Sequence, residues 1–226
     1  MVKTNNVLWT GGWDSTFRVI QLYRLGATIQ PIYVIDHNRI SSSKELSVVE
    51  ELSNSIPSKF SKSKGQILPL KIINRQDIPT NLFLKLIHKP LKTKNKIGKQ
   101  YYWLACLAKK YKYENLELSL HNEDLDKFFM LNQLIEFKDG KLGLNWKINP
   151  KKVGFSRKHL FANMTFPLVT ITKPEMKNIA EEHNFIDLME LTWFCHKSNN
   201  KPCGKCNPCK QYVRDGFGFR LEQQTQ

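Results

Sequence analysis

The sequence contains no run that approaches the roughly 20 apolar residues that a membrane-spanning helix requires. Its first residues, MVKTNNVLWTGGWD, also lack the apolar core of a secretory signal peptide. We therefore expect a cytoplasmic protein in a reducing compartment, without membrane association. Internal repeats and linkers rich in Gly, Ser or Pro are absent as well, so composition does not divide the chain into separate domains.

Acidic residues are few, because 20 Asp and Glu stand against 35 Lys and Arg, which gives a net charge of +15. A charge of this size indicates phosphates, nucleic acid, an anionic surface or an acidic protein as partner. A Lys-rich composition spread over a solvated surface accounts for it equally well. The 226 residues, 41% of them hydrophobic, suffice for a core without disulfides and exclude a disordered or fibrous chain.

Apolar residues recur at helical spacing in some segments and form short buried runs in others, and the two kinds alternate along most of the chain. This alternation predicts an α/β fold with a parallel five-stranded sheet and helices on both faces. Strands are expected at residues 7–9, 29–35, 67–73, 116–120 and 166–171. Helices are expected at residues 17–25, 44–52, 82–87, 101–111, 124–135 and 172–183. We further expect a loop at 53–65, a hairpin at 137–146 around Asp139-Gly140, and a capping box between Thr172 and Glu175.

A glycine-rich turn, Thr-Gly-Gly-Trp-Asp-Ser-Thr at residues 10–16, lies between the first expected strand and helix. Adjacent glycines let backbone N–H groups approach an anion, and the helix N-terminus adds partial positive charge. The hydroxyls of Thr10, Ser15 and Thr16 can donate to phosphate oxygens. Asp14 can cap the helix or hold Mg²⁺. The pattern predicts a phosphate-binding turn, with a plain capped strand-to-helix turn as the alternative; neither GxxxxGK[ST] nor GxGxxG occurs.

Four of the five cysteines, Cys195, Cys203, Cys206 and Cys209, have the spacing C-x7-C-x2-C-x2-C. In a reducing compartment such a cluster indicates metal binding rather than disulfides. Four thiolates suit a tetrahedral structural Zn²⁺, and an iron–sulfur cluster is the alternative. Cys106 lies among apolar residues of an expected helix and is interpreted as a packed core thiol.

The glycine-rich turn resembles the [ST]GGxDS loop of the PP-loop ATP pyrophosphatase superfamily, with Trp13 at the variable position. In that superfamily the loop binds the β,γ-pyrophosphate of ATP, which is cleaved between its α and β phosphorus atoms. The resemblance implies ATP with Mg²⁺ as cofactor. It assigns nucleotide binding to Thr10, Gly11, Gly12, Asp14, Ser15 and Thr16.

Together with Thr192-Trp193-Phe194-Cys195 and Pro202-Cys203-Gly204-Lys205-Cys206-Asn207-Pro208-Cys209, the turn resembles the 7-cyano-7-deazaguanine synthase family over essentially the whole chain. The resemblance implies an adenine nucleotide alpha hydrolase-like, Rossmann-like domain over residues 1–190. Residues 191–226 would form a zinc-binding appendage of the same domain. It adds Asp36, Arg39 and Gly98 to the nucleotide contacts. The catalytic residues would be Asp14, Ser15 and Lys173.

Family members are ATP-dependent ligases that adenylate the carboxylate of 7-carboxy-7-deazaguanine, and ammonia then attacks. Homodimers are usual among them. This chain departs from the family after the fourth expected strand, where the substrate signature is replaced by His121-Asn122-Glu123-Asp124. Asn122 and Asp124 are the candidates that retain part of the substrate site.

Three other interpretations stay open at this point. The first is an antiphage-defence relative that attaches a deazapurine to a protein partner. The second is an RNA-thiolating PP-loop enzyme with an iron–sulfur cluster, and the third is a protein that binds ATP without turnover. The basic run 89–99 before Tyr101, Tyr102 and Trp103 is compatible with RNA binding or with a solvated loop.

Overall fold

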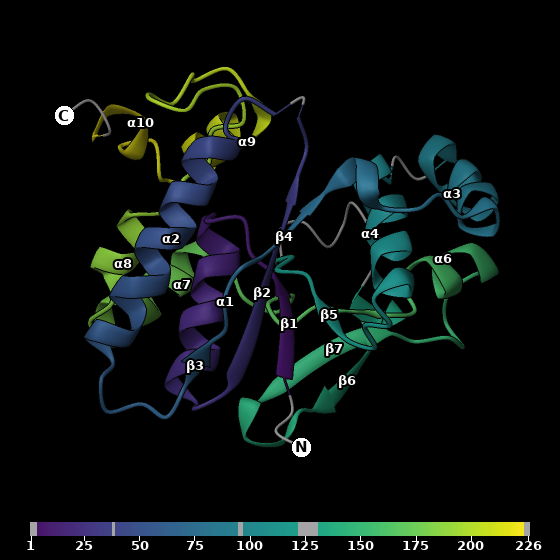
Figure 1. The fold of residues 1–226 in the computed structure, drawn as a ribbon, viewed down its shortest axis with the longest axis horizontal. Coiled ribbons are helices and arrows are strands. Elements are labelled where there is room, and N and C mark those ends of the chain that lie inside the picture. The colour runs from purple at the N-terminus through teal and green to yellow at the C-terminus, as the bar shows by residue number, and fades with distance from the viewer. Residues whose placement is uncertain (1–3, 38, 95–96, 122–130, 224–226) are drawn as a thin grey trace.

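A computed structural model describes residues 4–37, 39–94, 97–121 and 131–223. Its centre is a parallel sheet in the order β3-β2-β1-β5-β8, with β4 also paired to β2 (Figure 1). The strands are β1 (Thr4–Leu8), β2 (Thr28–Ile35), β3 (Gln66–Ile67), β4 (Lys71–Asn74), β5 (Leu116–Glu117) and β8 (Met164–Thr165). The predicted parallel α/β fold is confirmed, but the sheet in the described part of the chain has six strands where five were expected.

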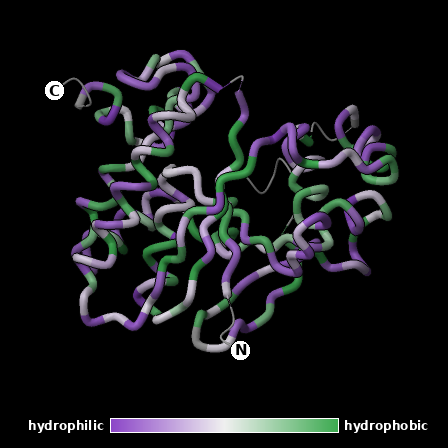
Figure 2. Tube along the Cα trace, viewed as in Figure 1, coloured by the Kyte–Doolittle hydropathy of each residue, from purple (hydrophilic) through white to green (hydrophobic). Residues whose placement is uncertain are grey.

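Helices cover both faces of the sheet (Figure 1). One side carries α1 (Trp13–Arg24), α2 (Ser42–Lys59), α7 (Lys173–Glu182) and α8 (Ile186–Glu190). The other carries α3 (Leu82–Lys94), α4 (Lys99–Lys110) and α6 (Phe155–Leu160). In Figure 2 hydrophilic and hydrophobic residues alternate along these outer helices, as expected where one helix face is buried. Among the described helices, none combines the length and apolarity needed to span a bilayer.

Two hydrophobic clusters fill the space between the sheet and its helices. Successive side chains of a strand point to opposite faces, so Val7 joins the cluster around α1 and Leu8 packs against the cluster around α4. Likewise Ile29 belongs to the first cluster and Ile32 to the second. The sheet is therefore buried on both faces, which is typical of a parallel sheet.

Three of the predicted strands differ from the structure. The third is divided into β3 and β4 on either side of Pro69, which has no N–H to donate. The fourth ends at Glu117 rather than at residue 120. Met164–Thr165 form the strand expected at 166–171, where Phe166 instead follows the strand, Val169 lies in a turn, and both are buried. A short buried apolar run does not reveal its conformation by periodicity.

Two helices extend beyond their predicted ends. The expected loop at 53–65 is helical to Lys59, because Ile56 is buried and Ser53, Ser55 and Ser58 donate to carbonyls one turn earlier. The expected short helix at 82–87 continues as α3 to Lys94, so half of the basic run is helical. Pro90 does not end α3, since Ile87 and Leu91 continue its buried stripe.

The remaining elements surround this framework. The predicted hairpin is confirmed as antiparallel β6 (Leu134–Lys138) and β7 (Leu144–Ile148), with η3 (Gly140–Leu142) between them. The helix expected at 124–135 lies partly outside the described residues, and its described end is η2 (Leu131–Gln133) followed by β6. The capping box of α7 is also confirmed. The other elements are η1 (Arg75–Asp77), α9 (Asn207–Arg214) and α10 (Arg220–Gln223).

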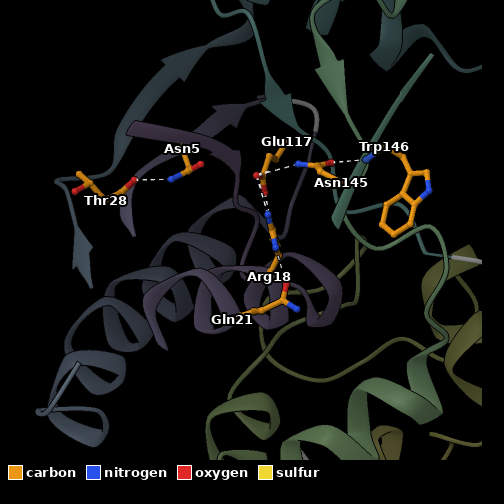
Figure 3. Close-up of polar contacts among 7 residues, drawn as sticks. All are labelled: Asn5, Arg18, Gln21, Thr28, Glu117, Asn145 and Trp146. Carbon is orange, nitrogen blue, oxygen red and sulfur yellow. Dashed lines mark hydrogen bonds and ion pairs between the residues drawn. The ribbon is translucent and has the colours of Figure 1, made fainter. Parts of the chain in front are cut away.

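A buried ion pair ties α1 to the sheet (Figure 3). Arg18 donates to both carboxylate oxygens of Glu117 on β5, at 2.7 and 3.0 Å, and also to Gln21. Asn145 of β7 donates to the same carboxylate at 3.4 Å and accepts from the N–H of Trp146. The helix that follows the glycine-rich turn is thus fixed to β5 and to the hairpin.

Candidate nucleotide site and metal centre

The glycine-rich turn lies where the strand order reverses, because β2 is on one side of β1 and β5 is on the other. Ligands of open α/β sheets bind outside the carboxyl ends of the strands at such a point. Gly11 has φ +67°, and a Cβ there would lie 3.1 Å from the Glu45 carbonyl oxygen and from Val48. The turn therefore requires glycine at this position.

The start of α1 is available for an anion. Gly12 is the N-cap and no side chain caps the helix, so the capping role considered for Asp14 is wrong. Ser15 donates to the Gly12 carbonyl at 3.2 Å. The Thr16 hydroxyl is buried and accepts from the Trp9 indole N–H at 3.0 Å, which braces the turn from behind. Thr10, Gly12, Asp14 and Ser15 line a cavity, and Thr16 does not.

This cavity, which we call the nucleotide cavity, measures about 900 Å³. Leu8, Val34 and Leu118 line it from the ends of β1, β2 and β5. Asp36 lies at its edge and is paired with Arg75 at 2.6 Å, while Arg39 is paired with buried Glu45 at 3.1 Å. Arg75 was not predicted, since it follows β4 and meets Asp36 only in the folded sheet.

Gly98 marks the start of a helix and is not among the residues that line the nucleotide cavity. It is the N-cap of α4, and its carbonyl lies 3.1 Å from His88 Nε2. The residues that follow it, Lys99 and Gln100, line the nucleotide cavity instead. Gly98 itself therefore does not line the nucleotide cavity, and the side chains of the two residues after it do.

Lys173 is the centre of a buried polar cluster. It is 3% exposed, and its Nζ lies 2.6 Å from His121 Nε2, 3.4 Å from Asp215 Oδ2 and 3.7 Å from Asp14 Oδ1. An ammonium only donates, so the His121 nitrogen accepts. Gln211 approaches the same nitrogen at 3.3 Å.

The Lys173 cluster borders a smaller cavity of about 320 Å³, which shares Thr10, Gly12 and Asp14 with the nucleotide cavity. Two predicted site residues, Asp14 and Lys173, thus meet at the smaller cavity, and Ser15 lines the nucleotide cavity that shares Asp14 with it. Asp215, Gln211 and His121 were not predicted to belong there, and no local motif marks them. Asn122 and Asp124 lie outside the described residues.

The C-terminal segment is packed against the glycine-rich turn. The N–H of Trp193 donates to the Gly11 carbonyl at 2.9 Å. Arg220 is buried, donates to the carbonyls of Glu190 and Thr192, and lies over the ring of Trp13 at 5.3 Å. The boundary predicted at residue 190 stays a prediction.

The four predicted cysteines form one cluster in the folded chain. Their sulfur atoms all lie within 4.8 Å of one another, with Cys206 4.0 Å from Cys195 and 3.3 Å from Cys209. Four thiolates around one Zn²⁺ would be about 3.8 Å apart, given a tetrahedron with Zn–S of about 2.3 Å. Gly204, at φ +67°, forms the tight turn between Cys203 and Cys206. The cluster can hold a metal ion.

The thiols of this cluster differ in their electrostatic surroundings. The backbone N–H of Lys205 lowers the pKa of Cys203 to about 6. Burial raises the pKa of Cys195 and of Cys209 above the ordinary thiol value. A bound cation favours the thiolate form of every ligand, so it would offset the burial of these two sulfur atoms. The donor set therefore suits a metal ion. Cys106 lies apart in α4, buried in the second hydrophobic cluster as predicted.

Comparisons with known proteins agree with this arrangement. The model of the family described as Queuosine biosynthesis protein QueC matches residues 150–218, which include Lys173 and all four cysteines. A 7-cyano-7-deazaguanine synthase of Prochlorococcus marinus (strain MIT 9515) is 41% identical over 44 residues, 20% of this chain and 19% of that protein. The 7-cyano-7-deazaguanine synthase 2 of Sulfurisphaera tokodaii (strain DSM 16993 / JCM 10545 / NBRC 100140 / 7) is 24% identical over 242 aligned residues, covering 97% of this chain and 46% of that protein.

The fold and the site define an α/β protein with a parallel sheet, a glycine-rich turn at the switch point and a four-cysteine cluster beside it. The chain is similar to the QueC family over residues 150–218 and to two 7-cyano-7-deazaguanine synthases. It spans less than half of the length of the curated relatives that it matches.

Proposed function

We propose that the chain is an ATP-dependent enzyme that adenylates a carboxylate, 7-carboxy-7-deazaguanine or a close analogue, for attack by ammonia or an amine. A carboxylate oxygen would attack the α phosphorus of ATP, and the bond to the β phosphate would break to release pyrophosphate. The nitrogen nucleophile would then attack the acyl carbon, expel AMP and form an amide. In a second activation the amide oxygen would attack the α phosphorus of another ATP, with loss of pyrophosphate and one N–H proton. AMP would then leave with that oxygen as the second N–H proton is lost, which gives the nitrile.

The observation that carries this proposal is the convergence of Asp14, Ser15 and Lys173 from separate parts of the chain on one pair of cavities. The uncapped start of α1 would hold the β and γ phosphates. Thr10 and Ser15 would donate hydroxyl hydrogen bonds to the same phosphates. Lys173, buried and aimed at Asp14, would neutralise charge that develops on the leaving pyrophosphate.

Magnesium bound together with ATP would supply positive charge that offsets the charge of the phosphates. Asp14 fits this role, because its carboxylate borders both cavities and is a hard oxygen donor. Arg39 and Asp36 would contact the nucleoside part of ATP in the nucleotide cavity. Val34 and Leu8 offer apolar surface for the base there.

We propose that the four cysteines hold a structural Zn²⁺. No thiolate would be left for chemistry, since four protein ligands close a tetrahedral site. Metal binding would hold the segment around Trp193 in its folded conformation. The N–H of Trp193 donates to the Gly11 carbonyl. In this way the metal centre would stabilise the glycine-rich turn without contacting the nucleotide.

Carboxylate-dependent exchange of labelled pyrophosphate into ATP tests the adenylation step. We expect exchange with 7-carboxy-7-deazaguanine and Mg²⁺, and AMP release when ammonia is added. Lys173→Met should abolish both reactions, whereas Lys177→Met, on the same helix, half-exposed and paired with Glu181, should leave them unchanged. ATP binding without exchange for any carboxylate would contradict the proposal.

A further inference from the structure

A second cavity lies beside the nucleotide cavity and is strongly basic. We call it the basic cavity; it measures about 930 Å³ and is bordered by α3, by the N-terminal part of α4 and by the segment after β4. Its cationic side chains are Arg75, Lys85, Lys89, Lys92 and Lys99. Asp36 is the only acidic side chain among the described residues that line it, and Arg75 already pairs with that carboxylate.

The lysines of α3 share one face of the helix. Lys85, Lys89 and Lys92 are at i, i+4 and i+7, so they follow one another along the axis at about 6 and 4.5 Å. The opposite face, with Leu84, Ile87 and Leu91, is buried in the second hydrophobic cluster. The row of cations is therefore fixed toward the cavity, because the helix cannot turn without exposing its apolar stripe.

Rings and apolar groups lie among these cations. Tyr102 and Trp103 of α4 line the cavity, as do Leu82 and Leu86 of α3, which are 72% and 60% exposed. The Tyr102 hydroxyl accepts from the Asn81 N–H at 3.2 Å, which fixes its ring. A row of cations beside aromatic rings is the arrangement that binds unpaired nucleotides, with phosphates on the cations and bases on the rings.

The two cavities adjoin each other. Asp36, Arg75, Lys99 and Trp103 line both of them. A polyanion held along α3 would therefore lead directly to the place where ATP is expected. A double helix is too wide for a concave site of this size, and an acidic peptide would satisfy the lysines but provide no bases for the rings.

We propose that the basic cavity binds single-stranded nucleic acid, and that the bound strand positions a nucleotide or its end group next to the nucleotide cavity. The proposal deepens the proposed function by naming a partner for the same site. Binding itself does not depend on ATP turnover, so the two can fail separately. Because the lysines recognise phosphates, the strand is RNA or DNA, and the experiment distinguishes them.

Fluorescence anisotropy with a labelled 12-nucleotide RNA, and with DNA of the same sequence, tests the proposal on the full chain. We expect binding that weakens as salt rises, with a slope of about −0.7 per phosphate contact in a plot of log affinity against log salt. The triple variant Lys85→Gln/Lys89→Gln/Lys92→Gln should bind about tenfold more weakly or worse, with a slope shallower by about 2.

The matched control is Lys62→Gln/Lys64→Gln/Lys151→Gln, which removes the same charge from exposed sites that do not line the cavity. It should bind like the unchanged protein. Equal weakening of both triples would overturn the proposal, since net charge alone would then explain binding. A protein that binds neither the RNA nor the DNA would also overturn the proposal. The nucleic acid that binds more tightly, RNA or DNA, would identify the kind of strand that the basic cavity prefers.

The aromatic wall separates nucleic acid from an acidic peptide. Trp103→Ala should weaken strand binding roughly tenfold, while Trp103→Phe retains a ring and most of the affinity. A polyglutamate peptide that competes as well as an RNA of equal charge would overturn the nucleic-acid assignment. The Lys85/Lys89/Lys92 triple should keep carboxylate-dependent pyrophosphate exchange. Strand binding by a protein without exchange would support this inference and contradict the proposed function.

Discussion

Lys173 has two carboxylates near its ammonium group, and they differ in kind. Asp14 belongs to the glycine-rich turn and faces the nucleotide cavity, whereas Asp215 lies just after α9, 8% exposed in its side chain. Asp215 Oδ2 is also closer to Nζ, at 3.4 Å against 3.7 Å. Asp14 would turn toward magnesium when ATP binds, so Asp215 and His121 would then hold the ammonium in position.

Asp215→Asn should therefore slow pyrophosphate exchange by about tenfold or more while the KM for ATP changes little. The amide preserves shape but removes the charge that orients Lys173, and an effect on positioning acts mainly on kcat. Steady-state exchange kinetics measure both constants. Glu181→Gln removes the exposed partner of Lys177 on the same α7 and should change neither. A rise in KM for ATP alone would assign Asp215 to binding instead.

The cysteine cluster yields a prediction about metal content. Cys209→Ser should reduce the metal bound per chain from about one to nearly none, and the free energy of unfolding should fall by several kcal/mol. Elemental analysis identifies and counts the metal, and thermal unfolding reports the stability. Cys106→Ser, the matched loss of a buried thiol outside the cluster, should keep the metal. Full metal content in Cys209→Ser would contradict the assignment of that ligand.

Residues close together in sequence were predictable, and residues joined only by folding were not. The glycine-rich turn and the four cysteines are each a contiguous pattern whose spacing implies geometry. Asp215 is 42 residues after Lys173, and Gln211 is 90 residues after His121, so no local spacing indicates that they meet. Thr16 fits the motif in the sequence, but in the folded chain its hydroxyl accepts a hydrogen bond from the indole N–H of Trp9.

At the scale of elements, α7 matters because it begins at Lys173. Thr172 accepts from the Glu175 N–H at 3.3 Å, and Glu175 accepts from the Thr172 N–H at 2.7 Å. The cap fixes the first turn of the helix and, with it, the direction of the lysine side chain. The box was predictable because its four residues are consecutive.

Thr172→Ala should lower the free energy of unfolding by about 1 kcal/mol, the usual cost of a lost N-cap. Thr172→Ser keeps the hydroxyl and should lose much less. Urea unfolding of both variants at pH 7 makes the comparison. If the two variants were equally stable, the hydroxyl bond would not contribute to the cap.

The same cap has a pH dependence. The Thr172 N–H lowers the pKa of Glu175, so its carboxylate binds protons less readily in the folded chain. Its contribution to stability is present in full above the ordinary pKa of glutamate and is lost as pH falls through the lowered value. Glu175→Gln should therefore narrow the stability difference between pH 7 and pH 3; an unchanged difference would remove Glu175 from the pH response.

Predictions of elements failed where tertiary packing overrode local signals. The Ser/Lys-rich composition of residues 53–65 suggested a loop, but buried Ile56 extends α2 to Lys59, past Pro57. Pro90 suggested a break in the basic run, but Leu91 is buried on the same stripe as Ile87. In both cases burial of the apolar residue next to the proline stabilises the helix by more than the proline costs.

At the scale of the whole molecule, the sheet separates two hydrophobic clusters, and the glycine-rich turn depends on how α1 is fixed to the sheet. The Arg18–Glu117 pair supplies that connection, because Arg18 is on α1 and Glu117 on β5. Both side chains are almost fully buried. Neither was singled out from the sequence, because charged side chains of helices and strands are usually solvated.

Removing one charge of this pair should destabilise the chain far more than removing both. Glu117→Gln leaves a buried guanidinium without its counter-charge and should lower the free energy of unfolding by about 3 kcal/mol or more. The double variant Arg18→Met/Glu117→Leu replaces the pair by apolar groups and should lose much less. Asp187→Asn, which breaks the exposed pair with Lys59, should change stability by less than about 1 kcal/mol.

Urea unfolding of these variants separates stability from function, and pyrophosphate exchange adds the second measurement. If the pair only stabilises the fold, the double variant should retain exchange in proportion to its folded fraction. If the pair also sets the orientation of α1, the double variant should fold and yet bind ATP weakly, because the turn at Gly11 would no longer meet Trp193 correctly. We expect the second result, since Glu117 is also held by Asn145 of the hairpin, and the network fixes α1 from two elements.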